Sequence, residues 1–238
     1  MPQRKLVITE DGSHTLYDPE SGENYHSTHG AIGESNHVFI EMALKAATSK
    51  KKKINILEIG WGTGLNTLLT AAECDKSKTS VTYVAVEPFP ISLGEASQLN
   101  YFEQIDHPAV REWTMKMHAH DHKYPYYLND QFILNVLTEK LEELRFAANS
   151  FDIVYFDAFS PEAAPGMWTA EVFSMLYEAM QFEGILTTYC AKGEVRRRML
   201  SAGFYVERVP GAPGKREMLR ATKLMTDPSA DHHHCHEH

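Results

Sequence analysis

The stretch 56–66 carries the residue types of a nucleotide-type cofactor site. An apolar, strand-like run that contains Glu58 precedes glycines at positions 60, 62 and 64. Gly60, Gly62 and Gly64 have no side chains to hold a cofactor away from the backbone, and they accept the positive φ angles of a tight strand-to-helix turn. The dinucleotide pattern is Gly-x-Gly-x-x-Gly, so the early third glycine favours a cofactor without a pyrophosphate. An ordinary turn that binds no ligand is the alternative.

Two more acids follow predicted strands. Glu87 ends the apolar run 81–86, 23 residues after the last glycine of the loop, where the ribose-binding acid of a Rossmann-like site is expected. Asp157 ends the run 151–156, at the edge where open α/β sheets bind ligands, and is the predicted catalytic residue. Met167 and Trp168 offer an apolar surface beside this acid and are predicted substrate contacts. Packing of the following helix would equally explain Trp168.

Alternating strand and helix patterns supply the scaffold for these residues. We expect strands at 54–59, 82–87, 132–134, 151–157, 184–189, 204–208 and 216–221, and helices at 36–48, 65–74, 91–102, 137–144, 172–180 and 194–202. This order predicts an α/β fold with a mostly parallel seven-stranded sheet that ends in an antiparallel hairpin. Asn135 should then end the third strand and contact the cofactor base, although a turn-forming role is equally consistent.

Composition places the chain among ordinary globular enzymes. It has 238 residues, of which 43% are hydrophobic and 23% charged. We expect an N-terminal extension over 1–35, one domain over 36–224 and a disordered, histidine-rich tail over 225–238. Three widely spaced cysteines, the lack of a leader-like start and the lack of a long apolar run predict a cytoplasmic protein that does not contact membranes.

The net charge of −9 argues against indiscriminate nucleic-acid binding, because such binding normally requires a broad positively charged surface. A local basic patch remains in the last fifth of the chain, where six of the 23 basic residues form two groups, 196–198 and 215–220. Arg196, Arg197, Lys215 and Arg216 from these groups are predicted substrate contacts, with a solvated helix face as the alternative for the arginines. The four histidines at 107, 118, 120 and 122 lack the spacing of metal ligands, so we expect them to be exposed and expect no metal.

Five motifs together resemble a known family. The motifs are NHVFIE (36–41), GWGTGLN (60–66), VEPFP (86–90), FDAFSPEAAPGMWT (156–169) and GKREML (214–219). The glycine loop resembles that of class I S-adenosylmethionine-dependent methyltransferases, and the whole set resembles the methyltransferase domain of the tRNA 5-methylaminomethyl-2-thiouridine biosynthesis family, over about 15–221. The resemblance implies S-adenosylmethionine as the cofactor, with Glu58 serving its methionine end and Asn66 part of the cofactor loop.

The resemblance also implies a reaction, which is methylation of the aminomethyl nitrogen on a wobble uridine of tRNA. Bifunctional members add a flavin-dependent oxidase domain; this chain is too short for one, so we expect the stand-alone form, no flavin, and a separate enzyme that makes the aminomethyl group. The family usually has Lys-Asn where this chain has Ala163-Ala164, and a smaller aromatic residue in place of Trp61. The alternatives are a small-molecule amine methyltransferase or aminopropyltransferase of the same fold, and a non-catalytic cofactor-binding scaffold.

Overall fold

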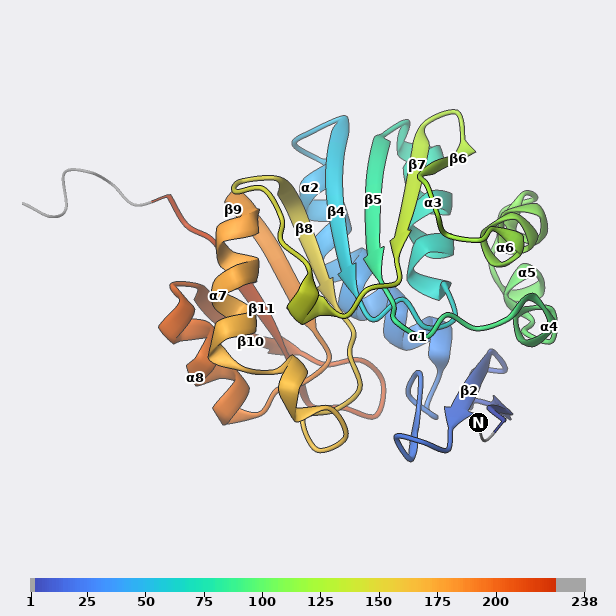
Figure 1. The fold of residues 1–238 in the computed structure, drawn as a ribbon, viewed down its shortest axis with the longest axis horizontal. Helices are drawn as coiled ribbons and strands as arrows, with labels where there is room; N and C mark the ends of the chain where they lie inside the picture. Colours follow the sequence, from blue (N-terminus) through green and yellow to red (C-terminus); the bar gives the residue numbers. More distant parts are fainter. Residues whose placement is uncertain (1–2, 226–238) are drawn as a thin grey trace, which may run out of the picture.

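An eight-stranded sheet forms the centre of the computed structural model, which describes residues 3–225 (Figure 1). Its strand order is β10-β11-β9-β8-β4-β5-β7-β6. The parallel part consists of β4 (Lys53–Ile59), β5 (Ser80–Val86), β7 (Phe132–Leu137), β8 (Phe151–Phe156) and β9 (Met180–Thr188). The antiparallel edges are β6 (Tyr126–Asn129) on one side and the hairpin of β10 (Tyr205–Pro210) and β11 (Glu217–Thr222) on the other.

The predicted α/β class, with its mainly parallel sheet and C-terminal hairpin, is confirmed. Two details differ. The short edge strand β6 adds an eighth strand, and the helix expected over 137–144 is absent from this described region. The strand β7 instead continues to Leu137, and only a 3₁₀ turn, Leu141–Glu143, follows it. Buried and half-buried residues alternate along β7, a period of two that the leucine spacing at 137, 141 and 144 concealed.

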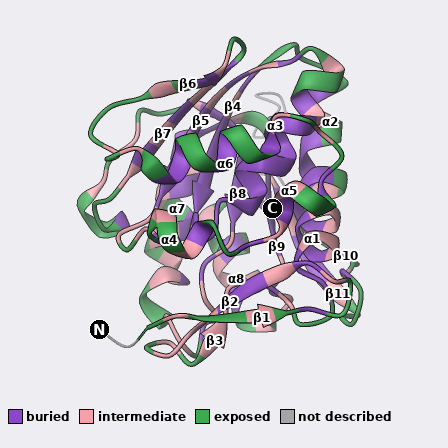
Figure 2. Cartoon of the chain, turned by 90° about the vertical axis from the view of Figure 1, so that its right-hand side faces the viewer, coloured by how far each residue is buried: buried purple, intermediate pink, exposed green. Residues whose placement is uncertain are grey.

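Helices cover both faces of the sheet. One face carries the continuous helical segment of α1 (Ala31–Ser35), the π-helical η1 (Asn36–Leu44) and α2 (Lys45–Thr48), together with α3 (Leu65–Ser77) and α6 (Val110–Ala119); the other carries α7 (Ala170–Ala179) and α8 (Gly193–Ala202). The strand β4 alternates between them, because Ile56 faces the first group and Leu57 the second. Figure 2 shows the buried residues concentrated along this sheet.

The predicted helix over 91–102 is wrong as a single element. It is divided into α4 (Leu93–Ala96) and α5 (Tyr101–Gln104). Ser92 and Glu95 form a capping box that begins α4, and the chain leaves the helical path before α5. No helix in residues 3–225 is long and apolar enough to cross a membrane.

A second, smaller sheet lies against the carboxyl ends of the parallel strands. It consists of β1 (Lys5–Ile8), β2 (His14–Asp18) and β3 (Glu23–Asn24), all from the segment predicted only as an extension (Figure 1). Asn100 ties it to the main domain, accepting a hydrogen bond from the His14 backbone N–H (2.9 Å) and donating one to the Gly12 carbonyl (2.9 Å). The boundaries at 35 and 224 stay predictions, and the predicted tail lies outside the described residues except for Met225.

Phe173 tests the packing of α7 on the sheet. Its buried ring lies 5.3 Å from that of Phe156 and 6.5 Å from that of Trp168, centroid to centroid. Phe173→Ala should lower the free energy of unfolding by about 3–5 kcal/mol, because the surrounding side chains cannot fully fill the cavity that the lost ring leaves. Leu200→Ala, on the exposed side of α8, should change it by less than about 0.5 kcal/mol. Denaturant unfolding measures both, and equal losses would contradict this packing.

Candidate active site

A cavity of about 600 Å³ lies between the carboxyl ends of β4, β5 and β8 and the N-terminal sheet. Gly60, Gly62, Glu87 and Asp157 line it from the main sheet, and residues 22–29 line it from the N-terminal side. Its volume falls within the range of about 300–1,000 Å³ typical of small-molecule sites. The cavity therefore brings together the glycine loop and the two strand-end acids that the sequence singled out.

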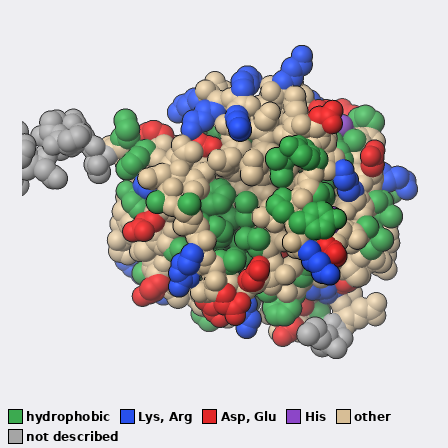
Figure 3. Space-filling model, turned by 45° about the horizontal axis from the view of Figure 1, so that its top comes forward, with side chains coloured by type: hydrophobic (Ala, Val, Ile, Leu, Met, Phe, Trp, Pro, Cys, Tyr) green, Lys and Arg blue, Asp and Glu red, His purple; other side chains and the backbone are tan. Residues whose placement is uncertain are grey.

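The cavity lies at one end of the sheet only. Exposed lysines at 51 and 52 precede β4 at the amino ends of the parallel strands, away from the cavity. Figure 3 turns that side of the molecule toward the viewer and shows Lys and Arg side chains gathered along its upper edge. Charge at this end does not contribute to the cavity wall.

Two glycines of the loop allow close backbone approaches. Gly60 has φ +86°, and a Cβ there would collide with the carbonyl oxygen of Asp157. Gly62 has φ +55°, and a Cβ there would lie 2.7 Å from the ring of Tyr25 in the N-terminal segment. The absence of a side chain at Gly60 thus lets the loop approach the backbone of Asp157. The absence of one at Gly62 lets Tyr25 of the N-terminal segment pack over the loop. Gly64 is the N-cap residue that precedes α3, and it does not line the cavity.

Glu87 is held in place by the backbone around it. Its two carboxylate oxygens accept hydrogen bonds from the N–H groups of Gly62 (2.9 Å) and Phe89 (3.2 Å). Burial raises the pKa of Glu87, and these two N–H groups partly offset the effect. Each oxygen keeps acceptor capacity toward the cavity, as recognition of hydroxyl groups requires.

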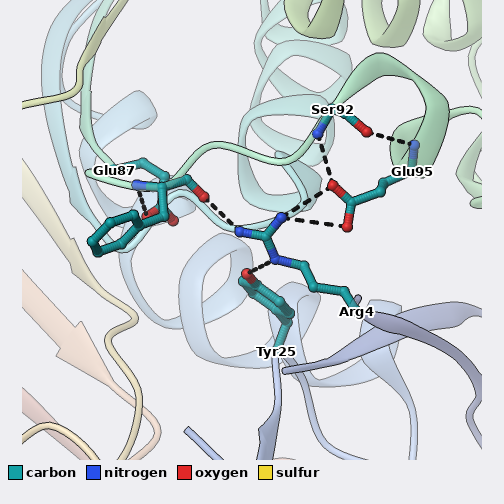
Figure 4. Close-up of polar contacts among 6 residues, drawn as sticks. Arg4, Tyr25, Glu87, Ser92 and Glu95 are labelled. Carbon is teal, nitrogen blue, oxygen red and sulfur yellow. Dashed lines mark hydrogen bonds and ion pairs between the residues drawn. The ribbon is translucent and has the colours of Figure 1, made fainter. Parts of the chain in front are cut away.

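Arg4 braces the N-terminal sheet against the loop that follows β5 (Figure 4). Its guanidinium donates to the hydroxyl of Tyr25 (2.9 Å), to the carboxylate of Glu95 (3.0 Å) and to the carbonyl of Phe89 (2.9 Å). These contacts connect residues far apart in the sequence, and no local pattern around Arg4 predicts them. The brace fixes the wall of the cavity beside Glu87.

A buried amide connects two carboxyl groups behind the glycine loop. The Nδ2 of Asn66 donates to Glu58 (2.6 Å) and to Asp157 (3.0 Å), while the hydroxyl of Tyr83 donates to the other oxygen of Glu58 (2.7 Å). Glu58 is fully buried and does not line the cavity. The structure therefore places Glu58 behind Asn66, and its role at the methionine end of the cofactor stays a prediction.

Both carboxyl groups favour their protonated forms. Burial, and secondarily the charge of Asp157, raises the pKa of Glu58 well above its usual range. Burial and the charge of Glu34 raise the pKa of Asp157 to about 8, although the Asn66 hydrogen bond and the Lys215 charge act in the opposite direction. A carboxyl group with this pKa in a cavity is suited to exchange a proton near neutral pH.

The remaining predicted residues divide into two groups. Met167 and Lys215 line the cavity. Those that do not are Asn135, Trp168, Arg196, Arg197 and Arg216, as well as Glu58, Gly64 and Asn66 already described. Asn135 lies within β7 rather than at its end, because the strand is longer than expected. Trp168 is fully buried, and its indole N–H donates to the Phe159 carbonyl (2.8 Å), so its position matches the packing alternative.

Sequence reasoning missed the cavity residues that come from the first 35 positions and from the end of β9. The side chain of Glu23 accepts hydrogen bonds from the backbone N–H (2.9 Å) and the hydroxyl of Ser160 (2.5 Å), three residues after Asp157. Glu34 and Tyr189 also line the cavity. The short β3 and the polar composition around it gave no pattern that marked these residues.

The prediction of four exposed histidines is wrong. None of them is exposed, and His118 stacks on Trp61 of the glycine loop with ring centroids 5.0 Å apart. Burial lowers the pKa of His118 to about 4. The amphipathic helix α6 turns this residue inward, a helix that the sequence pattern around 106–127 did not indicate. Within residues 3–225 no group of three His, Cys, Asp or Glu side chains is arranged to hold a metal ion.

Comparison with known proteins gives consistent matches. A family model described as S-adenosyl-L-methionine-dependent methyltransferase matches residues 100–224, more than half of the chain. The chain is 29% identical over 237 residues to the tRNA 5-methylaminomethyl-2-thiouridine biosynthesis bifunctional protein MnmC of Burkholderia multivorans, and 27% identical over 211 residues to that of Campylobacter hominis. These alignments cover 92% and 87% of the chain but 35% and 31% of the relatives, so the chain spans about a third of their length.

Two solved structures resemble this chain in fold. The crystal structure of MNMC2 from Aquifex aeolicus superposes with a TM-score of 0.76 at 26% identity, covering 96% of this chain and 73% of that one. A spermidine synthase from Thermotoga maritima has a TM-score of 0.53 at 14% identity, covering 96% and 74% of the two chains, which is a likeness of fold alone.

Glu58 provides a pH test of the buried network. An unfolded Glu ionises near pH 4.3, whereas folded Glu58 stays protonated to higher pH, so its contribution to stability is complete at acid pH and is lost as pH rises. The free energy of unfolding of the wild type minus that of Glu58→Gln should therefore fall between pH 4.5 and 8, by up to about 1.4 kcal/mol per pH unit. Denaturant unfolding across this range measures the difference, and a constant value would mean that Glu58 ionises normally.

Proposed function

Because the chain belongs to the S-adenosyl-L-methionine-dependent methyltransferase family, we propose that it methylates the nitrogen of a 5-aminomethyl group on a (2-thio)uridine at the tRNA wobble position. The product would be 5-methylaminomethyl-(2-thio)uridine. The observation that carries the proposal is that Asp157 enters the same cavity as the glycine loop and Glu87. The substrate class is the one named for the relatives, and this chain matches about a third of their length.

The cavity fits S-adenosylmethionine on several counts. Gly60 and Gly62 leave room along the backbone, and Glu87 presents acceptors for hydroxyl groups such as those of a ribose. Asn66 has a buried Oδ1 without a hydrogen-bond partner in the described structure, and its amide positions Asp157. When bound, the cofactor supplies the activated methyl group.

Asp157 is the residue proposed to act on the amine. An aliphatic amine such as that of the lysine side chain has a pKa of about 10.4 and is protonated at neutral pH, so its nitrogen has no free lone pair for attack. Transfer of that proton to an ordinary Asp would cross a pKa gap of about 6, whereas a pKa of about 8 reduces the gap to about 2. Asp157 can accept this proton only in its ionised form, which bound cationic groups favour, and burial makes that carboxylate more basic than an exposed one. The cavity aligns the reacting groups.

Arginine side chains outside the cavity are proposed to contact the tRNA. Arg197 and Arg216 are exposed, and Arg196 is half-buried, in the C-terminal part of the chain. Contacts from these side chains to phosphates would position the tRNA without reading its sequence. The aminomethyl group would have been added earlier by a separate reaction, and tRNA modification of this kind fits a cytoplasmic enzyme.

The aminopropyltransferase alternative has less support. The spermidine synthase shares the fold at 14% identity, and a fold alone does not define a reaction. A non-catalytic scaffold would not account for the position of Asp157, a buried carboxyl group that lines the same cavity as Gly60, Gly62 and Glu87.

Methyl transfer tests the proposed reaction. Purified protein with S-adenosylmethionine labelled in the methyl group should label tRNA that carries 5-aminomethyluridine, but not fully modified tRNA. Asp157→Asn should reduce kcat by about 10²-fold or more, since the amide cannot take up a proton, while the fold is kept. Full turnover by Asp157→Asn would contradict the role of this residue, and labelling of a free polyamine in place of tRNA would contradict the substrate.

Cofactor binding tests the raised pKa. Ligand-free Asp157 is mostly protonated at pH 7, and a cationic ligand favours its ionised form. The ratio of the Kd of S-adenosylhomocysteine, which lacks the sulfonium charge, to that of S-adenosylmethionine should therefore rise severalfold from pH 6.5 to 8.5. Calorimetry measures the ratio, and the amino group common to both ligands cancels from it. Asp157→Asn should remove the dependence; a pH-independent ratio in the wild type would contradict the assignment.

A further inference from the structure

Lys215 extends its ammonium group from the turn between β10 and β11 into the cavity. Its Nζ lies 3.1 Å from a carboxylate oxygen of Glu34 and 4.4 Å from the centre of the Tyr189 ring. The side chain of Glu34 is only 6% exposed, and its other carboxylate oxygen accepts a hydrogen bond from the backbone N–H of Ser27 (3.1 Å). The ammonium group of Lys215 thus already contacts a carboxylate and an aromatic face inside the candidate active site.

The two partners of Lys215 are fixed, whereas Lys215 itself is not. Glu34 belongs to α1, and Tyr189 directly follows β9, with its hydroxyl donating to the Ala158 carbonyl (2.8 Å) beside Asp157. The side chain of Lys215 is 35% exposed and comes from a turn, so it reaches solvent by rotation of its own flexible chain. A carboxylate together with an aromatic face is a general binding arrangement for an ammonium group.

The subsite also lies next to the proposed catalytic group. Both Glu34 and Lys215 act electrostatically on Asp157, with opposite signs. An amine that took the position of the Lys215 ammonium would leave the charge balance beside Asp157 unchanged. One cation would replace another, so Glu34 would not be left buried and unpaired.

We propose that Glu34 and Tyr189 form the subsite for the protonated amine of the substrate, and that Lys215 fills this subsite until the substrate displaces it. The inference rests on the proposed function, because it assumes an amine substrate. It assigns Lys215 to competition with the substrate amine rather than to direct binding of it. It also gives a role to two residues that the sequence did not single out.

Binding to two tRNAs tests the proposal. The tRNAs differ only in whether the wobble uridine carries the 5-aminomethyl group, and saturating S-adenosylhomocysteine prevents turnover. The ratio of the two Kd values, unmodified over aminomethylated, isolates recognition of the ammonium group. We expect a ratio of about tenfold in the wild type, about 1 in Glu34→Gln, and a further increase of about threefold or more in Lys215→Met.

Tyr189 supplies a matched pair of variants. Tyr189→Phe keeps the ring and loses only the hydroxyl, so the ratio should stay near that of the wild type. Tyr189→Leu removes the aromatic face and should lower the ratio by about threefold. Thermal unfolding and S-adenosylhomocysteine binding report whether each variant is folded, and Tyr189→Leu decides the outcome if Glu34→Gln is unfolded.

The outcomes separate the inference from the proposed function. Methyl transfer by the wild type together with an unchanged ratio in Glu34→Gln and Tyr189→Leu would overturn the amine subsite and leave the reaction intact. A lower ratio in Lys215→Met than in the wild type would also overturn it, because Lys215 would then bind the substrate directly. Absence of methyl transfer to the aminomethylated tRNA would overturn the proposed function itself.

Discussion

The close contact between the backbone of Gly60 and that of Asp157 positions the other groups of the site. Neighbouring strand ends are joined by backbone hydrogen bonds, from Gly60 N–H to the Val86 carbonyl (3.1 Å) and from Asp157 N–H to the Ile59 carbonyl (2.8 Å). No Cβ fits at position 60, because it would collide with the Asp157 carbonyl at a φ of +86°. This close approach sets the floor of the cavity and brings the glycine loop beside the acid that follows β8.

Buried carboxyl groups determine the chemistry above that floor. One amide, Asn66, donates to two carboxyl groups, and burial raises the pKa of both Glu58 and Asp157. Only Asp157 faces the cavity, so Glu58 acts through Asn66 and keeps that amide oriented. The N-terminal sheet then covers the site, held by Arg4 on one side and by the Glu23 contact with Ser160 on the other. Electrostatic interactions among the buried groups beneath this cover are stronger than they would be in bulk water.

The sequence predicted the part of the site that depends on local order along the chain. Gly60, Glu87 and Asp157 each follow a strand of the parallel sheet, and carboxyl ends of parallel strands meet at one edge, so their proximity could be inferred. Glu34 and Arg4 could not be found this way, since their partners lie 181 and 91 residues away in the sequence. Asn135 was expected at the end of its strand but lies within β7, because the nearly helical spacing of the following leucines hid the continuation of this strand.

A crystal structure of the complex with S-adenosylhomocysteine would show whether the cavity under the N-terminal sheet is the cofactor site. We expect the ligand to lie against Gly60 and Gly62, with its ribose hydroxyl groups bonded to Glu87, while residues 22–29 stay in place over it. A ligand bound elsewhere, or a cofactor position that requires the backbones of Gly60 and Asp157 to separate, would contradict it.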